Sequence, residues 1–182
     1  MKTTKKGFTL IELIVVIAII GVLAAILVPA MLGYVKKSKV SSANSAANTL
    51  QKAINTALVE IDEETEEAAK IKSMTGSSGS SAATGKVVTA DGAISDSTYS
   101  DANTYKKIVN YMDKVYKYDF YAVCDGGVCV GVALRQPSAK YTGTCPGGVI
   151  TVDNFESKSK TALSELASQA ATKGGWKATA ST

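Results

Sequence analysis

The chain contains no histidine, only three prolines and a single tryptophan among its 182 residues. The absence of histidine excludes a Ser-His-Asp triad, a Cys-His dyad, an HExxH zinc site and any metal centre with imidazole ligands. The three cysteines, without a histidine and with a C-x4-C spacing, do not fit a structural zinc site either. Since no other acid–base constellation stands out, we expect no catalytic residues, no metal and no cofactor, and we expect that the chain is not an enzyme.

Positive charge is scarce in most of the chain, although the net charge is +4. Six of the 20 basic residues are lysines that lie before residue 7 or between residues 36 and 39. Residues 40–182 therefore hold the other 14 bases against 15 acids, a net charge of about −1. A nucleic-acid-binding domain carries a basic patch, which this composition lacks. We expect no specific nucleic-acid partner.

The sequence contains one long apolar run, at residues 13–32. Residues 13–32 contain 18 apolar residues and no charge, which is the length needed to cross a hydrocarbon core of about 30 Å. The run is compatible with a secretory signal that is cleaved near Ala30, although it is longer than most such signals. It is also compatible with a permanent single-pass anchor. Neither interpretation accounts for the polar residues at its front edge.

Thr9 and Glu12 form that front edge. Their spacing fits the S/T-x-x-E capping box, in which both side chains bond orphan backbone N–H groups at a helix start. A carboxylate at the edge of a membrane segment is also costly and marks a function that involves a partner charge. Both interpretations of Glu12 remain open at this point.

The hexapeptide GFTLIE at positions 7–12, with the apolar run up to Pro29, closely resembles the N-terminus of type IV prepilins and pseudopilins. The resemblance covers about the first 35 residues. It implies that a membrane-embedded prepilin peptidase cleaves between Gly7 and Phe8 on the cytoplasmic side and N-methylates the new amine of Phe8. Residues 1–7 are then a leader peptide, and with its three lysines removed the net charge falls to +1.

The resemblance also implies how the subunits assemble. Glu12, next to Thr9 at the start of the helix, pairs with the amino group of Phe8 on a neighbouring copy, because two opposite charges attract most strongly in an apolar setting. The stretch between Gly21 and Pro29 is implied to lose helical order when subunits leave the bilayer. The implied partners are further copies of the chain, the prepilin peptidase, the pilus or secretion machinery and the lipid bilayer. The implied locations are the cytoplasmic membrane first and an extracellular filament afterwards.

Beyond the apolar run, a helical periodicity continues. Apolar residues recur at intervals of three and four, and no proline or glycine interrupts residues 34–75, so we expect one helix from about Phe8 to Ile71, roughly 95 Å long. Its transmembrane and filament-core part spans 8–35, and an amphipathic continuation spans 36–72. The acidic run at 60–67 is expected to be a solvated face, with a cation site as the alternative.

Residues 73–182 are expected to form a separate globular head. Its predicted elements follow from turn residues and apolar alternation. They are a variable loop (73–98) with a short strand at 87–88, a helix (101–113), a β-hairpin (118–134), a strand (149–152) and a C-terminal helix (154–171). The fold class is therefore α+β, in which a long N-terminal helix packs by its second half against a small antiparallel sheet, as the pilin resemblance implies.

The hairpin brings two of the three cysteines together. A two-residue turn at Gly126-Gly127 predicts that Cys124 faces Cys129, with Val123 opposite Val130 and Tyr121 opposite Val132. A disulfide is a candidate here because an exported head permits oxidation. We favour a bridge from Cys145 to Cys124 or to Cys129, which would tie residues 136–148 to the hairpin. Three free thiols remain the alternative.

These observations predict a structural subunit of a type IV pilus-like surface filament that serves adhesion, motility or DNA uptake. A pseudopilin of a type II secretion system carries the same N-terminal motif and is the alternative within the family. A single-pass, membrane-anchored binding domain is the alternative of a different class.

Overall fold

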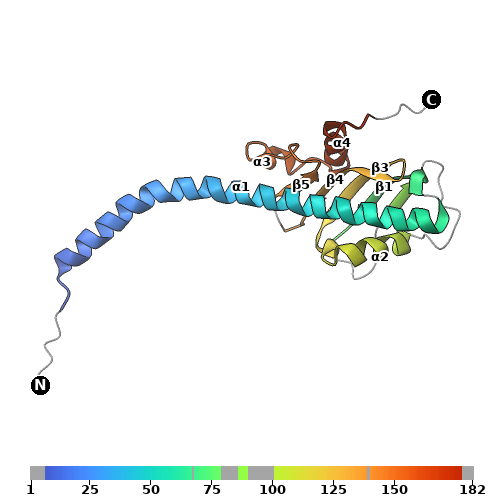
Figure 1. The fold of residues 1–182 in the computed structure, drawn as a ribbon. Helices are drawn as coiled ribbons and strands as arrows, with labels where there is room; N and C mark the ends of the chain where they lie inside the picture. The colour runs from blue at the N-terminus through green and yellow to red at the C-terminus, as the bar shows by residue number, and fades with distance from the viewer. Residues whose placement is uncertain (1–6, 67, 79–85, 90–100, 139, 178–182) are drawn as a thin grey trace, which may run out of the picture. The chain divides into compact units, whose positions relative to one another are not determined.

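The computed structural model describes residues 7–66, 68–78, 86–89, 101–138 and 140–177. Most of the predicted leader, and most of the predicted variable loop, lie outside these residues. By contact density the chain divides into two compact units, Met1–Ser38 and Lys39–Thr182. The second unit combines part of a long helix with a five-stranded antiparallel sheet and short helices (Figure 1). The predicted α+β, pilin-like fold class is confirmed.

Helix α1 runs without interruption from Leu10 to Thr65. It ends earlier than the predicted Ile71, at Glu66, whose φ of 57° leaves the helical region. Its last turn is acidic and contains no basic residue, and negative side chains are unfavourable at the negative end of the helix dipole. A 3-10 turn (Ala68–Lys70) then leads into strand β1 (Ile71–Gly76), so the expectation of helix to 72 and loop from 73 is wrong at this junction.

The sheet has the strand order β2-β1-β3-β4-β5, with every neighbouring pair antiparallel. The other strands are β2 (Lys86–Thr89), β3 (Asp119–Asp125), β4 (Val128–Arg135) and β5 (Thr142–Cys145). Strand β2 lies where a short strand was expected, and β3 with β4 forms the expected hairpin. The expected strand at 149–152 is wrong. The side chain of Asn154 instead accepts the Thr151 N–H (2.8 Å) and donates to the Val149 carbonyl (3.0 Å), which folds these residues into a turn.

The hairpin register departs from the prediction after its first pairs. Cys124 faces Cys129 as predicted, but Val123 pairs with Gly131 and Tyr121 with Ala133. One extra residue on β4 therefore forms a β-bulge next to the turn. A bulge shifts every later pair by one, and apolar alternation alone does not reveal it.

Two layers of side chains cover the sheet. On one face, β3 and β4 contribute Phe120, Ala122, Val132 and Leu134 to a core shared with α1 and with α2 (Asp101–Tyr111). The α1 members of this core are Ala47, Leu50, Ala53, Ile54, Ala57, Leu58 and Ile61, which form the predicted apolar stripe. On α2, Tyr105 and Ile108 are buried at a helical spacing of three, and Met112 is buried just after the helix ends.

The opposite face packs against the C-terminal helices. The predicted helix 154–171 is split into α3 (Phe155–Lys158) and α4 (Leu163–Lys173). The break lies at Ala162, which has an extended backbone (φ −60°, ψ 141°) and precedes α4. Leu166 and Ala167 of α4 pack with Val123 and Ala133 of the sheet in a second core.

Part of the acidic run contacts α2. Lys107 Nζ lies 2.9 Å from Glu64 and 3.4 Å from Glu60, and the Tyr111 hydroxyl donates to Glu60. The bond to Glu64 raises the pKa of Lys107, and the bond to Glu60 raises that of Tyr111. The run is therefore paired in part with its own chain.

Candidate assembly site at the N-terminus

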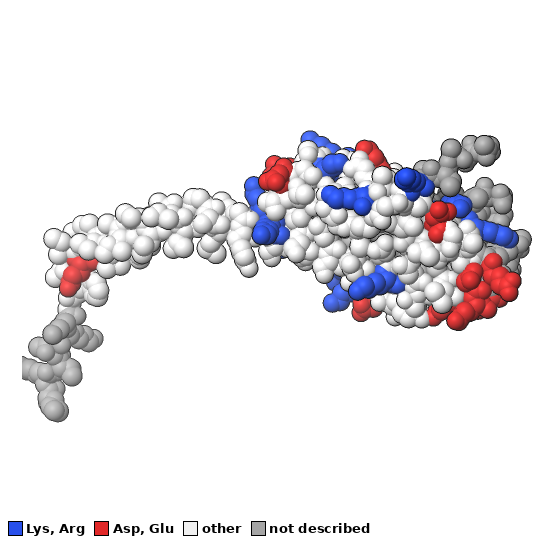
Figure 2. Space-filling view, turned by 45° about the horizontal axis from the view of Figure 1, so that its top comes forward, with Lys and Arg blue, Asp and Glu red and all other residues white. Residues whose placement is uncertain are grey.

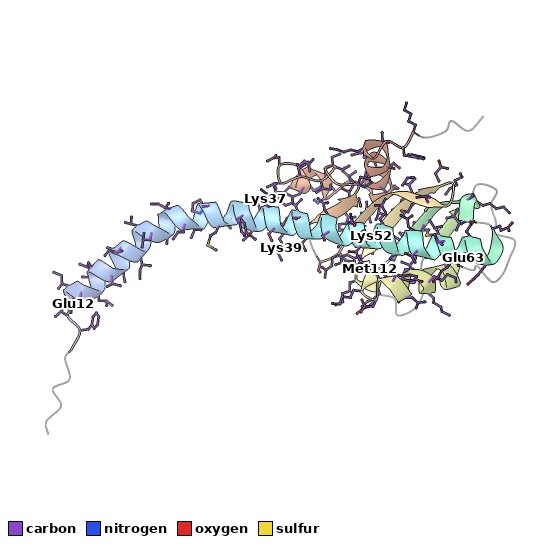
Figure 3. The ribbon with its side chains drawn as sticks, in the orientation of Figure 1. Glu12, Lys37, Lys39, Lys52, Glu63 and Met112 are labelled. Carbon is purple, nitrogen blue, oxygen red and sulfur yellow. The ribbon has the colours of Figure 1, made fainter. Side chains whose placement is uncertain are left out.

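Glu12 lies at the start of α1 (Figure 3), where it forms a capping box with Thr9. The Thr9 backbone N–H and the Thr9 hydroxyl donate to Glu12 Oε2 at 2.9 and 2.5 Å, and the Glu12 N–H lies 3.4 Å from the Thr9 hydroxyl. These bonds satisfy orphan N–H groups of the first turn. The capping interpretation is thus confirmed for the isolated chain. Both hydrogen bonds that the Glu12 carboxylate accepts end on its Oε2 atom. Phe8, which is 81% exposed, lies just before the helix.

The apolar side chains that follow Glu12 are exposed all around the helix. Their exposed fractions run from 44% at Val35 to 76% at Leu10. Figure 2 shows this stretch without a Lys, Arg, Asp or Glu on the visible surface between its single acidic side chain and the first basic residues. Among the described residues, only this helix is long and apolar enough to cross a membrane, judged by length and composition. An apolar surface of this extent requires lipid or protein to cover it.

Gly21 and Pro29 both lie inside the continuous helix α1. A Cβ added at Gly21 would meet nothing within 4 Å, so no contact within the chain requires a glycine there. Pro29 removes one backbone N–H from the helical ladder. The helix is therefore weakened at these two positions, and loss of helical order between them stays a prediction.

The three cysteines lie in the second unit and are buried, free thiols. Cys124 and Cys129 face each other across the β3–β4 hairpin, and Cys145 ends β5. Burial raises the pKa of the Cys145 thiol. The predicted disulfide stays a prediction. Among the described residues no group of three or more Cys, Asp or Glu is arranged to hold a metal ion.

A set of amide side chains on α1, which was not predicted from the sequence, binds the backbone of the sheet. Asn55 Oδ1 accepts the Cys129 N–H at 2.7 Å, and Gln51 Nε2 donates to the Cys129 carbonyl at 2.9 Å. Asn44 Oδ1 accepts the Thr144 N–H at 3.0 Å. The signal was available in the sequence, because positions 44, 51 and 55 repeat at intervals of seven and four and so share one side of a helix.

Comparison with known proteins gives a family model that matches the N-terminus and several relatives that match part of the chain. The model for the prokaryotic N-terminal methylation motif matches residues 2–28. The type IV major fimbrial protein FimA of Dichelobacter nodosus is 48% identical over 60 residues, which cover 33% of this chain and 38% of that protein. A fimbrial protein of Moraxella nonliquefaciens is 54% identical over 52 residues (29% and 34%), and fimbrial protein EcpC of Eikenella corrodens is 51% identical over 55 residues (30% and 36%).

These matches span little more than a third of each relative. No solved structure matches the chain. The methylation motif covers the capped start of α1, and the fold is a long apolar N-terminal helix followed by a small antiparallel sheet. In its methylation motif, its partial identity with fimbrial proteins and this architecture, the chain is similar to type IV pilins.

Proposed function

We propose that the chain is a structural subunit of a type IV pilus-like surface filament and that it polymerises through its apolar N-terminal helix. The observation that carries this proposal is the exposed apolar surface of α1 between Leu10 and Val35, with one carboxylate, Glu12, at its start. A bilayer covers such a surface before assembly, and the same surface of neighbouring copies covers it in a filament core. The names of the fimbrial relatives favour a surface filament over the pseudopilin alternative. They are also names of structural proteins, which supports a non-enzymatic role.

Processing precedes assembly in this proposal. A prepilin peptidase removes residues 1–7, and the new amine of Phe8 is methylated. The match to the methylation motif supports this step. Cleavage also leaves the Phe8 amine as the cation at the front edge of the apolar segment, because the lysines of the leader leave with it. The protein stays in the cytoplasmic membrane as a single-pass protein until the assembly machinery extracts it.

Glu12 then has two successive roles. In the single subunit it caps α1 through Thr9. In the filament its carboxylate pairs with the amine of Phe8 on a neighbouring copy, either in place of the cap or in addition to it. A buried carboxylate without a counter-ion is strongly unfavourable, so the pair selects one axial register between subunits. Softening of the helix between Gly21 and Pro29 accompanies the transfer from lipid to filament.

The pair Glu12→Gln and Glu12→Ala tests this proposal. Glutamine keeps the capping box, since Gln serves at this position as Glu does, but it removes the charge. If the charge pairs with Phe8, both variants accumulate in the membrane and neither forms filaments, as seen by electron microscopy of sheared surface material. Glu63→Gln removes an exposed acid from the same helix (Figure 3) and should assemble normally.

Normal filaments from Glu12→Gln would contradict the pairing role and leave only the cap. Mass spectrometry of the mature protein adds a second test, because its N-terminus should be N-methylated Phe8. A start after Ala30 would indicate a secretory signal. A mature chain that begins at Phe8 but is never found in filaments of any length would favour the membrane-anchored binding domain.

A further inference from the structure

The β3–β4 turn determines how Cys124 and Cys129 meet. Gly126 and Gly127 have φ values of 58° and 77°, which a two-residue type I′ turn requires. Asp125 and Val128 close this turn, and Cys124 and Cys129 form the next pair. In an antiparallel hairpin, the pair after the closing one is the non-hydrogen-bonded type, with Cα atoms about 4.5 Å apart. That separation lies within the range of about 4.4–6.8 Å that a disulfide spans.

The hydrogen bonds of Cys129 support this assignment independently. Its N–H donates to Asn55 and its carbonyl accepts from Gln51, both on α1, so neither group is directed to Cys124. Both thiols belong to the same core, with exposed fractions of 1% and 2%. A hydrogen bond to Cys124 and burial raise the pKa of Cys129 well above its ordinary value. The thiol of Cys129 also lies 3.8 Å from the Gly131 carbonyl.

Cys145 is held by a different partner. Its thiol donates to Gln51 Oε1 at 2.8 Å, while the Nε2 of the same amide donates to the Cys129 carbonyl at 2.9 Å. The Gln51 amide thus links Cys145 to the backbone of Cys129. A bridge from Cys145 to either other cysteine would have to break the bond to Gln51. The structure therefore favours a bridge between Cys124 and Cys129 over the bridges from Cys145 that the sequence suggests.

We propose that Cys124 and Cys129 are a redox pair that closes a cross-strand disulfide when the chain meets a disulfide oxidant, while Cys145 remains a thiol. One thiolate attacks the oxidant RSSR and releases RS⁻, and the second thiolate attacks the resulting mixed disulfide and releases another RS⁻. Two thiols are oxidised, one oxidant disulfide is reduced to two thiols, and the protons pass to the released groups. Since both thiols are buried, oxidation is faster while the hairpin forms than in the folded chain. The bridge locks the hairpin register next to its bulge.

Tryptic peptide mapping of the full chain in detergent tests the pair. Cys124 and Cys129 share peptide 118–135, whereas Cys145 lies in peptide 141–158. The reduced chain is unfolded and refolded with oxidised glutathione, and free thiols are then blocked with N-ethylmaleimide. We expect peptide 118–135 to be unmodified and lighter than its reduced form by the mass of a hydrogen molecule, and peptide 141–158 to carry one label.

Two variants keep the test independent of folding yield. Cys145→Ser should give the same oxidised peptide in the same proportion, and Cys129→Ser should give a labelled Cys124 under identical conditions. A cross-link between the two peptides would overturn the pairing, and labels on all three thiols would overturn the disulfide itself. The inference does not depend on filament formation, so it stands or falls separately from the proposed function.

Discussion

At the scale of single residues, Gly143 in β5 lies directly against the backbone of α1. A Cβ on this residue would lie 1.9 Å from the Ala43 carbonyl oxygen and 2.3 Å from the Ala43 carbonyl carbon. Both atoms belong to the helix backbone, which cannot give way as a flexible side chain can. The adjacent bond from the Thr144 N–H to Asn44 holds the strand in this position. Only glycine fits at Gly143.

We predict that Gly143→Ala lowers the free energy of unfolding by about 1–3 kcal/mol, the range for an added group in a packed core. Urea denaturation followed by circular dichroism measures this loss. Gly147→Ala is the matched control, because a Cβ there meets nothing within 4 Å, and it should change stability by less than about 0.5 kcal/mol. Equal stability of the two variants would show that β5 does not contact Ala43.

At the scale of elements, α1 contacts the sheet in two ways. Its apolar stripe packs in the core, and its amide side chains form hydrogen bonds to the backbone of the strands. Strand β5 pairs with β4 only over Val132–Arg135, so the outward backbone groups of Cys129 lack a strand partner. Asn55 and Gln51 of α1 bind those groups instead. The helix therefore completes the hydrogen bonding of β4 where the sheet ends.

Replacing Asn55 with alanine leaves the Cys129 N–H without its acceptor. An unsatisfied buried backbone group costs about 1–3 kcal/mol, so we predict a loss of this size in a denaturant titration. The exposed Thr56, whose hydroxyl bonds only within the helix to the Lys52 carbonyl, provides the control Thr56→Ala. Because alanine favours helix at both positions, a loss confined to Asn55→Ala reports the contact between helix and strand. Equal effects of both substitutions would argue against that contact.

The helices and strands differ in how far the local sequence predicts them. The stripe on α1 and the inner face of α2 could be predicted, because period and amphipathicity are local properties of the sequence. Strand β1 could not, since Ile71–Gly76 becomes a strand only by pairing with β2 and β3. The apolar residues near Ile150 have strand propensity, yet Ile150 is buried in the second core from a turn. Tertiary packing decides between such local alternatives.

At the scale of the whole molecule, the two units differ in how they cover apolar surface. The buried core residues begin at Val40 and belong to the unit Lys39–Thr182. The described apolar residues of Met1–Ser38 are exposed. The first unit therefore depends on a bilayer or on other copies, whereas the second has a core of its own.

We predict that residues 39–182 fold without detergent as a soluble monomer that unfolds cooperatively. Size-exclusion chromatography and thermal circular dichroism measure this, with the full chain in detergent as the reference. The reason is that removing residues 1–38 deletes no member of either hydrophobic core. Aggregation of the fragment, or a non-cooperative melt, would show that the second unit needs the first in order to fold.

The apolar segment, the Thr9–Glu12 cap and the resemblance to pilins can be recognised in the sequence alone, because each depends on residues close together in the chain. The sequence also indicated the α+β class and the two-residue hairpin turn. The strand at Ile71–Gly76 and the binding of Asn55 and Gln51 to Cys129 could not be predicted in this way. Both depend on groups far apart in the sequence, which become neighbours only when the strands pair and the sheet packs on the helix.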